Sequence, residues 1–91
     1  MSIPTLLKDP HAVLDYGFDW SEWLATGETI SSSAWTIPTG IIKDSDTNTT
    51  TTTTAWLSGG TVGTTYLVVN RITTSAGRTE DRSVYIRVEN R

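Results

Sequence analysis

Few residues of this 91-residue chain are suited to acid-base or nucleophilic chemistry. The sequence contains one histidine, His11, and no cysteine. A catalytic histidine must lie within hydrogen-bond reach of its partner, and His11 lies near the N-terminus with no G-x-S-x-G or comparable motif around it. The absence of cysteine excludes a thiolate nucleophile, a disulfide framework and a thiolate metal site. The sequence therefore predicts that the protein is not an enzyme.

Two acidic segments offer oxygen atoms to a cation, but neither has the pattern of a metal site. The segment DSDTN (44–48) has oxygen atoms at alternate positions, yet the central glycine and closing glutamate of a calcium loop are absent. The second segment contains Asp15, Asp19 and Glu22, and its D-W-S-E stretch is typical of a helix start with an acidic first turn. We therefore expect a solvated turn, a short helical turn, and no bound metal or other cofactor.

The segment LDYGFDWSEWLATGETI (14–30) places four aromatic rings within eight residues, with acidic residues between them. A corner of a domain this small can bury two rings, so one pair should serve the core and the other should stay partly exposed. Aromatic anchors inside a polar rim are the usual makeup of a protein interface. The segment therefore predicts a partner-binding site that consists of Tyr16, Phe18, Trp20, Trp23, Asp19 and Glu22.

The tryptophans also allow a different function. Trp20, Trp23, Trp35 and Trp56 could form the flat platform of a carbohydrate-binding β-sandwich used for host attachment. Two or three of them could equally be core residues, because few other side chains in the sequence are as large. A sugar binder would need two or three coplanar exposed rings on a monomer, whereas an adaptor would pair its apolar residues with a partner. A carbohydrate-binding module is therefore the alternative function.

The elements that position these residues must form one small core. Apolar residues make up 36% of the chain, and the length suits a single domain. The formal net charge of −3 argues against a nucleic-acid partner, because binding to phosphates needs clustered lysine and arginine. No stretch reaches the roughly 20 apolar residues of a membrane span, and the start MSIPTLLKDP does not have the pattern of a secretory signal. We expect a soluble protein, assembled in a cytoplasm, with no membrane partner.

The residue pattern is that of an all-β protein. Threonine, valine, isoleucine and the aromatic residues dominate the middle and end of the chain, and these types favour strands. The clearest unit is a hairpin of residues 64–74 and 82–89 that turns at Gly77. In its second strand the alternation points three apolar residues inward, and Arg87 outward. The inward residues are Val84, Ile86 and Val88.

Weaker patterns predict the remaining strands. We expect strands near residues 11–16, 28–40 with a bulge near Ser33, 40–46 and 55–60. Between the last two, residues 44–50 should form a mobile loop that passes into an exposed edge strand at Thr51–Thr54, because polythreonine favours extended backbone.

The strand count and spacing predict a small immunoglobulin-like antiparallel β-sandwich of six to seven strands. The G-T-T-Y stretch at 63–66 is similar to the tyrosine corner of such domains, in which a phenol bonds back to the backbone. We assign residues 1–10 to an N-terminal arm and residues 11–91 to the single domain.

Two quoted stretches give the chain a family resemblance over about residues 8–90. One is D-Y-x-x-D-W-x-x-W-L-x-x-G-E-T-I, from Asp15 to Ile30, and the other is N-R-I-T-T-S-A-G-R-T-x-D-R-S, from Asn70 to Ser83. With these stretches the chain resembles the small proteins of tailed bacteriophages known as fiber-tail adaptors, or minor tail and neck proteins. The resemblance implies an immunoglobulin-like sandwich without catalytic residues, present in several copies in the virion, that bridges the tail or neck to fibers. Other virion proteins and copies of the chain itself are then the expected partners.

Overall fold

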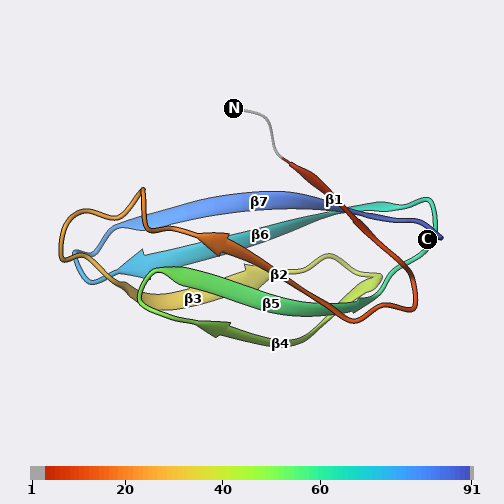
Figure 1. Cartoon of the computed structure of the whole chain (residues 1–91), viewed down its shortest axis with the longest axis horizontal. Helices are drawn as coiled ribbons and strands as arrows, with labels where there is room; N and C mark the ends of the chain where they lie inside the picture. The colour runs from red at the N-terminus through yellow and green to blue at the C-terminus, as the bar shows by residue number, and fades with distance from the viewer. Residues whose placement is uncertain (1–3, 91) are drawn as a thin grey trace.

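The protein folds into seven strands in two stacked sheets, and no helix forms within residues 4–90, the part of the chain that the computed structural model describes (Figure 1). The larger sheet has the strand order β1-β7-β6-β3, and the smaller sheet has the order β2-β5-β4. The predicted all-β, immunoglobulin-like sandwich is therefore confirmed. The strands are β1 (Thr5–Lys8), β2 (Leu14–Asp19), β3 (Ile30–Thr36), β4 (Ile41–Asn48), β5 (Thr52–Gly59), β6 (Thr65–Thr74) and β7 (Thr79–Val88).

The hairpin of β6 and β7 forms the centre of the larger sheet, as the sequence predicts. The two strands pair antiparallel, and Gly77, with a φ angle of 81°, lies in the turn that joins them. The inward residues Val84, Ile86 and Val88 are 3%, 0% and 0% exposed, so the predicted register is confirmed. β7 begins three residues earlier than predicted, because Asp81 pairs with Arg71 across the hairpin.

The threonine-rich segment forms two strands of the smaller sheet. Residues 44–48 complete β4 and residues 52–54 begin β5, which lies between β2 and β4. The prediction of a mobile loop at 44–50 followed by an exposed edge strand is therefore wrong. Because six threonines follow one another, the sequence shows no alternation here, yet Thr53 lies on the inner face and is completely buried.

β3 is an edge strand of the larger sheet and contains the predicted bulge. The register against β6 shifts between Ile30 and Ser32, slightly before the expected position at Ser33. A bulge adds one residue to a strand and changes which residues face inward. Here it allows both Ile30 and Trp35 to pack against the core although their spacing is odd.

Two apolar clusters fill the space between the sheets. The smaller cluster contains Trp20, Ile30 and Ile72, and the larger contains residues from both sheets. Phe18 packs against both clusters, so the segment that follows β2 is continuous with the main core. The larger cluster consists of Tyr16, Ile41, Ala55, Leu57, Tyr66, Val68, Val84, Ile86 and Val88.

Part of the segment that we assigned to an N-terminal arm lies in the larger sheet. Residues 5–8 form β1, which pairs in parallel with β7. The Lys8 side chain is completely buried, and its Nζ donates hydrogen bonds to the carbonyl oxygens of Gly59 at 2.7 Å and Asp9 at 2.9 Å. Burial lowers the pKa of Lys8, against the opposing effect of nearby carboxylates. Residues 1–3 of the predicted arm lie outside the described residues.

Tyr66 at the entrance to β6 makes the predicted tyrosine corner. Its hydroxyl accepts a hydrogen bond from the backbone N–H of Thr61 at 2.9 Å. The connection between β3 and β4 passes directly against the ring, since a Cβ added to Gly40 would lie 2.9 Å from a Tyr66 ring carbon. Gly40 also has a φ angle of 107°, which L side chains rarely adopt, so a glycine is required on both counts.

Candidate interaction site

The predicted partner-binding residues lie on β2 and on the turn that follows it. In β2, Tyr16 and Phe18 point toward the core, while Asp15 and Asp19 point outward, as expected for a strand with one buried face. Next comes a single turn of residues 20–24, here called the Trp20 turn, in which the N–H of Leu24 donates to the Trp20 carbonyl at 3.1 Å. This is the short turn that the D-W-S-E stretch predicts.

Asp19 caps the Trp20 turn. Its Oδ1 accepts a hydrogen bond from the Ser21 N–H at 2.9 Å, and the N–H of Trp23 donates to the Trp20 carbonyl at 3.0 Å. The bond from Ser21 lowers the pKa of the Asp19 carboxyl. Local sequence therefore explains why the chain turns here, because a side-chain carboxylate at this position satisfies a backbone donor that has no partner within the turn.

The structure separates the six predicted residues into three environments. Tyr16 and Trp20 are core residues, 8% and 0% exposed. Phe18 and Trp23 are partly buried, and the carboxylates of Asp19 and Glu22 are exposed. The sequence argument expects one buried and one partly exposed pair of rings, and each observed pair takes one ring from β2 and one from the Trp20 turn.

The rings form a continuous row through the corner of the sandwich. Trp20 makes edge-to-face contacts with Trp23 and Phe18, with ring centroids 5.6 and 6.2 Å apart. Phe18 in turn stacks on Trp35 of β3, with centroids 5.8 Å apart and ring planes 19° apart. Such aromatic pairs add to the energy of burial. The aromatic cluster therefore joins β2 of the smaller sheet to β3 of the larger one.

Two arginines from the β6–β7 hairpin cover the tryptophans. The guanidinium carbon of Arg82 lies 4.2 Å from the centroid of the Trp20 ring, and that of Arg78 lies 4.1 Å from Trp23. Both distances are within the range of cation–π attraction. Arg82 also donates a hydrogen bond to the Asp19 carbonyl at 2.9 Å. The tryptophans therefore have part of their faces occupied by the protein's own cations.

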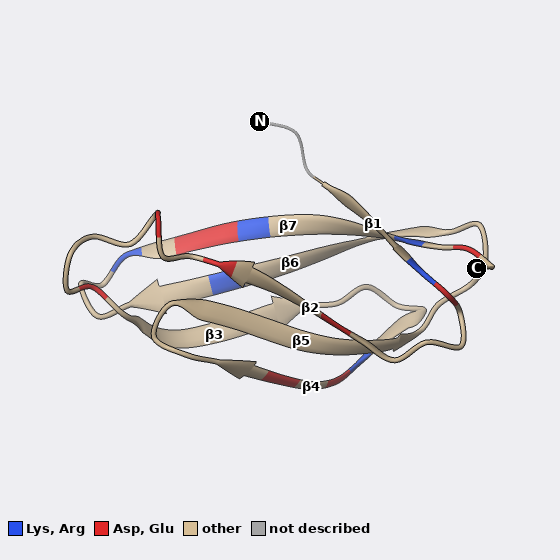
Figure 2. Cartoon of the chain, viewed as in Figure 1, with Lys and Arg blue, Asp and Glu red and all other residues tan. Residues whose placement is uncertain are grey.

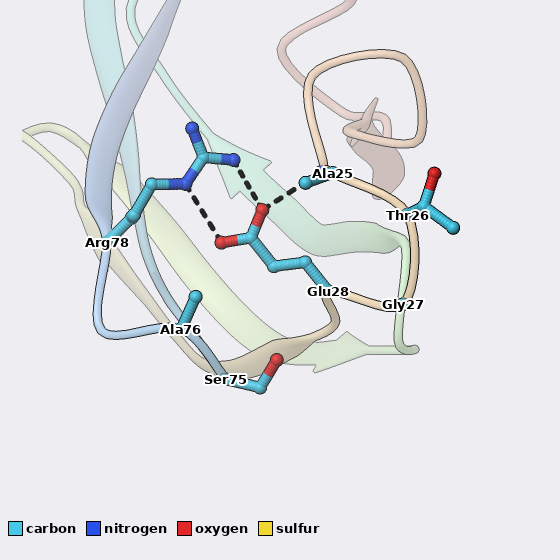
Figure 3. A pocket seen from close by; sticks show the side chains of 7 residues that line it. All are labelled: Ala25, Thr26, Gly27, Glu28, Ser75, Ala76 and Arg78. Carbon is cyan, nitrogen blue, oxygen red and sulfur yellow. Dashed lines mark hydrogen bonds and ion pairs between the residues drawn. The ribbon is translucent and has the colours of Figure 1, made fainter.

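Arg78 also holds a buried carboxylate, that of Glu28 (Figure 3). The Glu28 side chain is 3% exposed and accepts hydrogen bonds from Arg78 Nε at 2.9 Å, the Ala25 N–H at 2.9 Å and the Thr74 hydroxyl at 2.5 Å. A second Arg78 nitrogen contacts the other carboxylate oxygen. The bonds from Arg78, with those from Thr74 and Ala25, lower the pKa of Glu28 to about 2.

An open depression of about 280 Å³ lies between the loops that carry Glu28 and Arg78 (Figure 3). The two side chains point toward each other across it, so their charges neutralise one another rather than face a ligand. Residues 25–27, Ser75 and Ala76 provide the remaining lining. The depression is therefore a site of contact between two loops.

A chain of buried polar groups connects the aromatic cluster to both sheets. The Thr53 hydroxyl accepts a hydrogen bond from the Trp20 indole nitrogen at 3.1 Å and donates one to the Asn70 side-chain oxygen at 2.6 Å. The Asn70 amide nitrogen then donates to the Ser33 hydroxyl and the Ala34 carbonyl, at 2.9 and 3.1 Å. Every member of this chain has a partner, as buried polar groups require.

Sequence reasoning missed the residues that determine which rings are buried. Glu28, Thr53, Asn70, Arg78 and Arg82 all contact the corner, but none carries a motif that assigns it there. The one feature of the sequence that could have identified these residues is the pair of stretches 15–30 and 70–83 that carry the family resemblance. The two stretches contain all of them except Thr53. A pairing between the stretches could have been proposed from their opposite charges at Glu28 and Arg78.

Within residues 4–90, the other candidate residues do not form a catalytic, metal-binding or sugar-binding arrangement. His11 has an exposed side chain, and its backbone N–H donates to the Asp9 carboxylate at 2.8 Å. Within residues 4–90, no group of three or more histidine or acidic side chains is placed to hold a metal ion. Trp56 is the one aromatic side chain in this part of the chain that is largely exposed, at 41%, so it has no exposed coplanar neighbour with which to form a sugar platform.

A family model described as podophage GP4 fiber-tail adaptor protein gp77 matches residues 8–87. The chain belongs to this family. The family resemblance drawn from the sequence is confirmed, and with it a structural adaptor role in a phage tail. A search of curated proteins finds no match. No helix within residues 4–90 has the length and apolar character needed to cross a membrane.

Solved structures agree with the fold of this fiber-tail adaptor. The solution structure of the PKD domain from the KIAA 1837 protein is similar, with a TM-score of 0.54 and 21% sequence identity over 97% of this chain and 80% of that one. At this identity the likeness concerns the immunoglobulin-like fold alone.

The two stretches that carry the family resemblance lie against each other in the adaptor fold. Glu28 of the first stretch binds Thr74 and Arg78 of the second. Trp20 and Trp23 of the first lie under Arg82 and Arg78 of the second. One corner of the sandwich therefore accounts for most of both stretches, and much of their residue choice is explained by folding alone.

Proposed function

We propose that this protein is a non-enzymatic structural protein of the virion that links the tail or neck of a tailed bacteriophage to its fibers. The observation that carries the proposal is the match of the fiber-tail adaptor model over residues 8–87. A sandwich with a closed core, and with partly exposed aromatic and exposed acidic side chains at one end, suits a linking role better than a catalytic one. The expected partners are tail, neck or fiber proteins and further copies of the chain, assembled in the cytoplasm of the host bacterium.

The contact surface that we propose is the outer side of the Trp20 turn. Trp23 is partly buried beneath Arg78 and provides the apolar anchor, and the exposed carboxylates of Asp19 and Glu22 form its rim. Phe18 continues the anchor toward the core, while Tyr16 and Trp20 hold it from below. Central aromatic anchors with a polar rim are the residues that dominate binding energy in known interfaces.

The experiment separates folding from incorporation into particles. Trp23→Ala and Glu22→Arg would be compared with the core variant Trp20→Ala, measuring thermal unfolding of the isolated protein and its abundance in purified virions by mass spectrometry. Trp20→Ala should unfold the protein, because its ring is fully buried. Glu22→Arg should leave unfolding unchanged and reduce incorporation by about tenfold or more. Trp23→Ala should lower the unfolding temperature only slightly but should strongly reduce the abundance of the protein in virions.

A matched control is Thr39→Arg. Thr39 is exposed in the connection between β3 and β4, at the end of the sandwich opposite the Trp20 turn (Figure 1). This variant should enter particles normally. If Glu22→Arg is also incorporated normally, and every ring substitution that reduces incorporation also unfolds the protein, the aromatic cluster is core and the contact surface is elsewhere.

A further inference from the structure

The outer face of the smaller sheet presents an apolar centre flanked by carboxylates. Trp56 on β5 is 41% exposed, and Ile42 on β4, in the neighbouring row, is 58% exposed. Asp15 and Asp19 point from β2 to the same side, because Asp15 pairs with Trp56 and Asp19 with the outward residue Thr52. We call this surface the small-sheet face.

A third carboxylate completes the small-sheet face. Asp44 lies in the β4 bulge, and its Oδ1 accepts a hydrogen bond from the outward hydroxyl of Ser58 at 3.0 Å. Lysine and arginine are absent from the outward positions of all three strands. Figure 2 shows the acidic segments along β2 and β4, with β5 uncharged between them, and one basic segment, that of Lys43, at the start of β4, where Lys43 pairs with Asp46. The small-sheet face is therefore apolar at its centre and negative around it.

The outer face of the larger sheet also has an apolar centre, and the arginines that flank it are each paired with an exposed carboxylate of the same chain. Leu67 on β6 is 40% exposed and pairs with Tyr85 on β7, and Leu7 on β1 is 41% exposed on the same side. Two cations flank this apolar centre, Arg71 on β6 and Arg87 on β7. Each has an ion pair within the chain, with Asp81 and Glu89 respectively, but the two arginine side chains remain 63% and 43% exposed. We call this surface the large-sheet face.

The charges on the two faces have the same spacing from the apolar centre. On the small-sheet face, Asp19 lies beside Thr52, four residues along β5 from Trp56, and Asp44 lies beside Ser58, two residues in the other direction. On the large-sheet face, Arg71 is four residues along β6 from Leu67, and Arg87 lies opposite Thr65, two residues in the other direction. At about 3.3 Å per residue, the charges on both faces lie about 13 Å and about 7 Å from the central apolar residue, measured along the strand direction.

From this match we infer that the small-sheet face of one copy of the chain binds the large-sheet face of a second copy. Trp56 packs on Leu67 and Tyr85, while Asp19 faces Arg71 and Asp44 faces Arg87. Two sheets pack face to face at about 10 Å with their strands within about 30° of each other, which allows both charge pairs to meet. The contact surface proposed above for the virion partner shares Asp19 with the small-sheet face. This inference rests on the two sheet faces alone and does not depend on the proposed function.

An interface of this kind joins two different surfaces of the same chain. Each copy therefore keeps one free small-sheet face and one free large-sheet face, so further copies add head to tail and form a ring or a stack. The exposed ion pairs within each copy contribute little by themselves, so sharing an arginine with the neighbour's carboxylate costs little. The arrangement explains why Trp56 is exposed on the small-sheet face while Leu7 and Leu67 are exposed on the large-sheet face.

The test is sedimentation velocity of the full chain up to about 1 mM protein, which detects millimolar dissociation constants. The wild type should sediment faster as its concentration rises. Raising salt from about 0.1 M to about 1 M shortens the Debye length from about 10 Å to about 3 Å, and should weaken the association. Trp56→Ser and Leu67→Glu, each folded by circular dichroism, should raise the dissociation constant by about tenfold or more.

Mixing the two variants gives the decisive result. Trp56→Ser retains an intact large-sheet face and Leu67→Glu retains an intact small-sheet face, so the equimolar mixture should form a 1:1 dimer and stop there. The control Val62→Ser removes another exposed apolar side chain, 48% exposed in the turn before β6, and should associate like the wild type. A wild type that stays monomeric at every concentration overturns the inference. So does association that only Trp56→Ser weakens, which would mean that two small-sheet faces bind each other, and so does association that neither variant changes.

Discussion

Glu28 and Arg78 form an ion pair in which the carboxylate is buried and the guanidinium is half exposed, with side chains 3% and 46% exposed. The pair joins the loop before β3 to the turn between β6 and β7, 50 residues apart in the chain. Burying a carboxylate is unfavourable unless it is paired and fully hydrogen bonded, and here Arg78, Thr74 and the Ala25 N–H meet that requirement.

Acid should destabilise the protein partly through Glu28. The ordinary pKa of 4.5 applies to the unfolded chain, whereas the pKa of Glu28 in the folded protein is about 2. Between these values the unfolded state binds more protons, so the stabilisation is complete above about pH 5 and is lost as the pH falls toward 2. Thermal unfolding from neutral pH downward should show this loss.

Glu28→Gln tests the assignment of this acid effect. The variant should unfold at a lower temperature than the wild type at pH 7, because a neutral amide cannot pair with Arg78. Its unfolding temperature should then fall less steeply between about pH 5 and 2. Part of the acid dependence should remain, since hydrogen bonds from Ser21 and Arg71 lower the pKa values of Asp19 and Asp81. An unchanged acid dependence would show that the ion pair does not stabilise the fold.

Replacing Ile86 by alanine should lower the free energy of unfolding by about 2 to 5 kcal/mol. Ile86 is completely buried in the larger apolar cluster, so the change removes packed atoms and leaves a cavity. Chemical denaturation measures the loss. The neighbouring substitution Arg87→Ala, on the outward face, should leave the midpoint almost unchanged. A loss below about 0.5 kcal/mol for Ile86→Ala would contradict the register of β7.

The parts of the fold that the sequence predicts well are those with different residues on the two faces of a strand. In β7, apolar and polar residues alternate, and the inward positions follow directly. In the threonine run the two faces carry the same residue, so periodicity gives no strand and no inward position. β1 was missed for another reason, because four residues form a strand there only through pairing with β7.

The candidate site was predictable in composition but not in geometry. Crowding of aromatic residues shows that some rings must be buried and others partly exposed. The identity of the buried pair depends on distant groups, since Thr53 binds the Trp20 indole and Arg82 covers its ring. Such contacts depend on how the sheets stack, which local periodicity does not encode.

Lys8→Ala should loosen β1 while the remainder of the larger sheet stays intact. The buried Lys8 ammonium holds the Gly59 carbonyl at 2.7 Å and so ties β1 to the end of β5. Without it we expect faster hydrogen exchange at Leu6 to Lys8 and little change in the β6–β7 hairpin. Leu7→Ala is the matched control, because its side chain is 41% exposed on the outer face. Equal effects of the two variants would show that the lysine contacts do not anchor the strand.

Replacing Thr53 by valine should cost about 1 to 3 kcal/mol of folding free energy although the shape of the side chain is kept. Valine can neither accept the hydrogen bond from the Trp20 indole nitrogen nor donate one to Asn70, so both groups are left buried without that partner. The control is Thr54→Val on the outward face of the same strand, which should change stability by no more than about 0.5 kcal/mol. Chemical denaturation of both variants, with tryptophan fluorescence followed in parallel, distinguishes the two positions. Thr53 and Thr54 are adjacent and identical, so the two substitutions change strand propensity equally. Equal losses of folding free energy would therefore mean that the buried polar chain does not stabilise the sandwich.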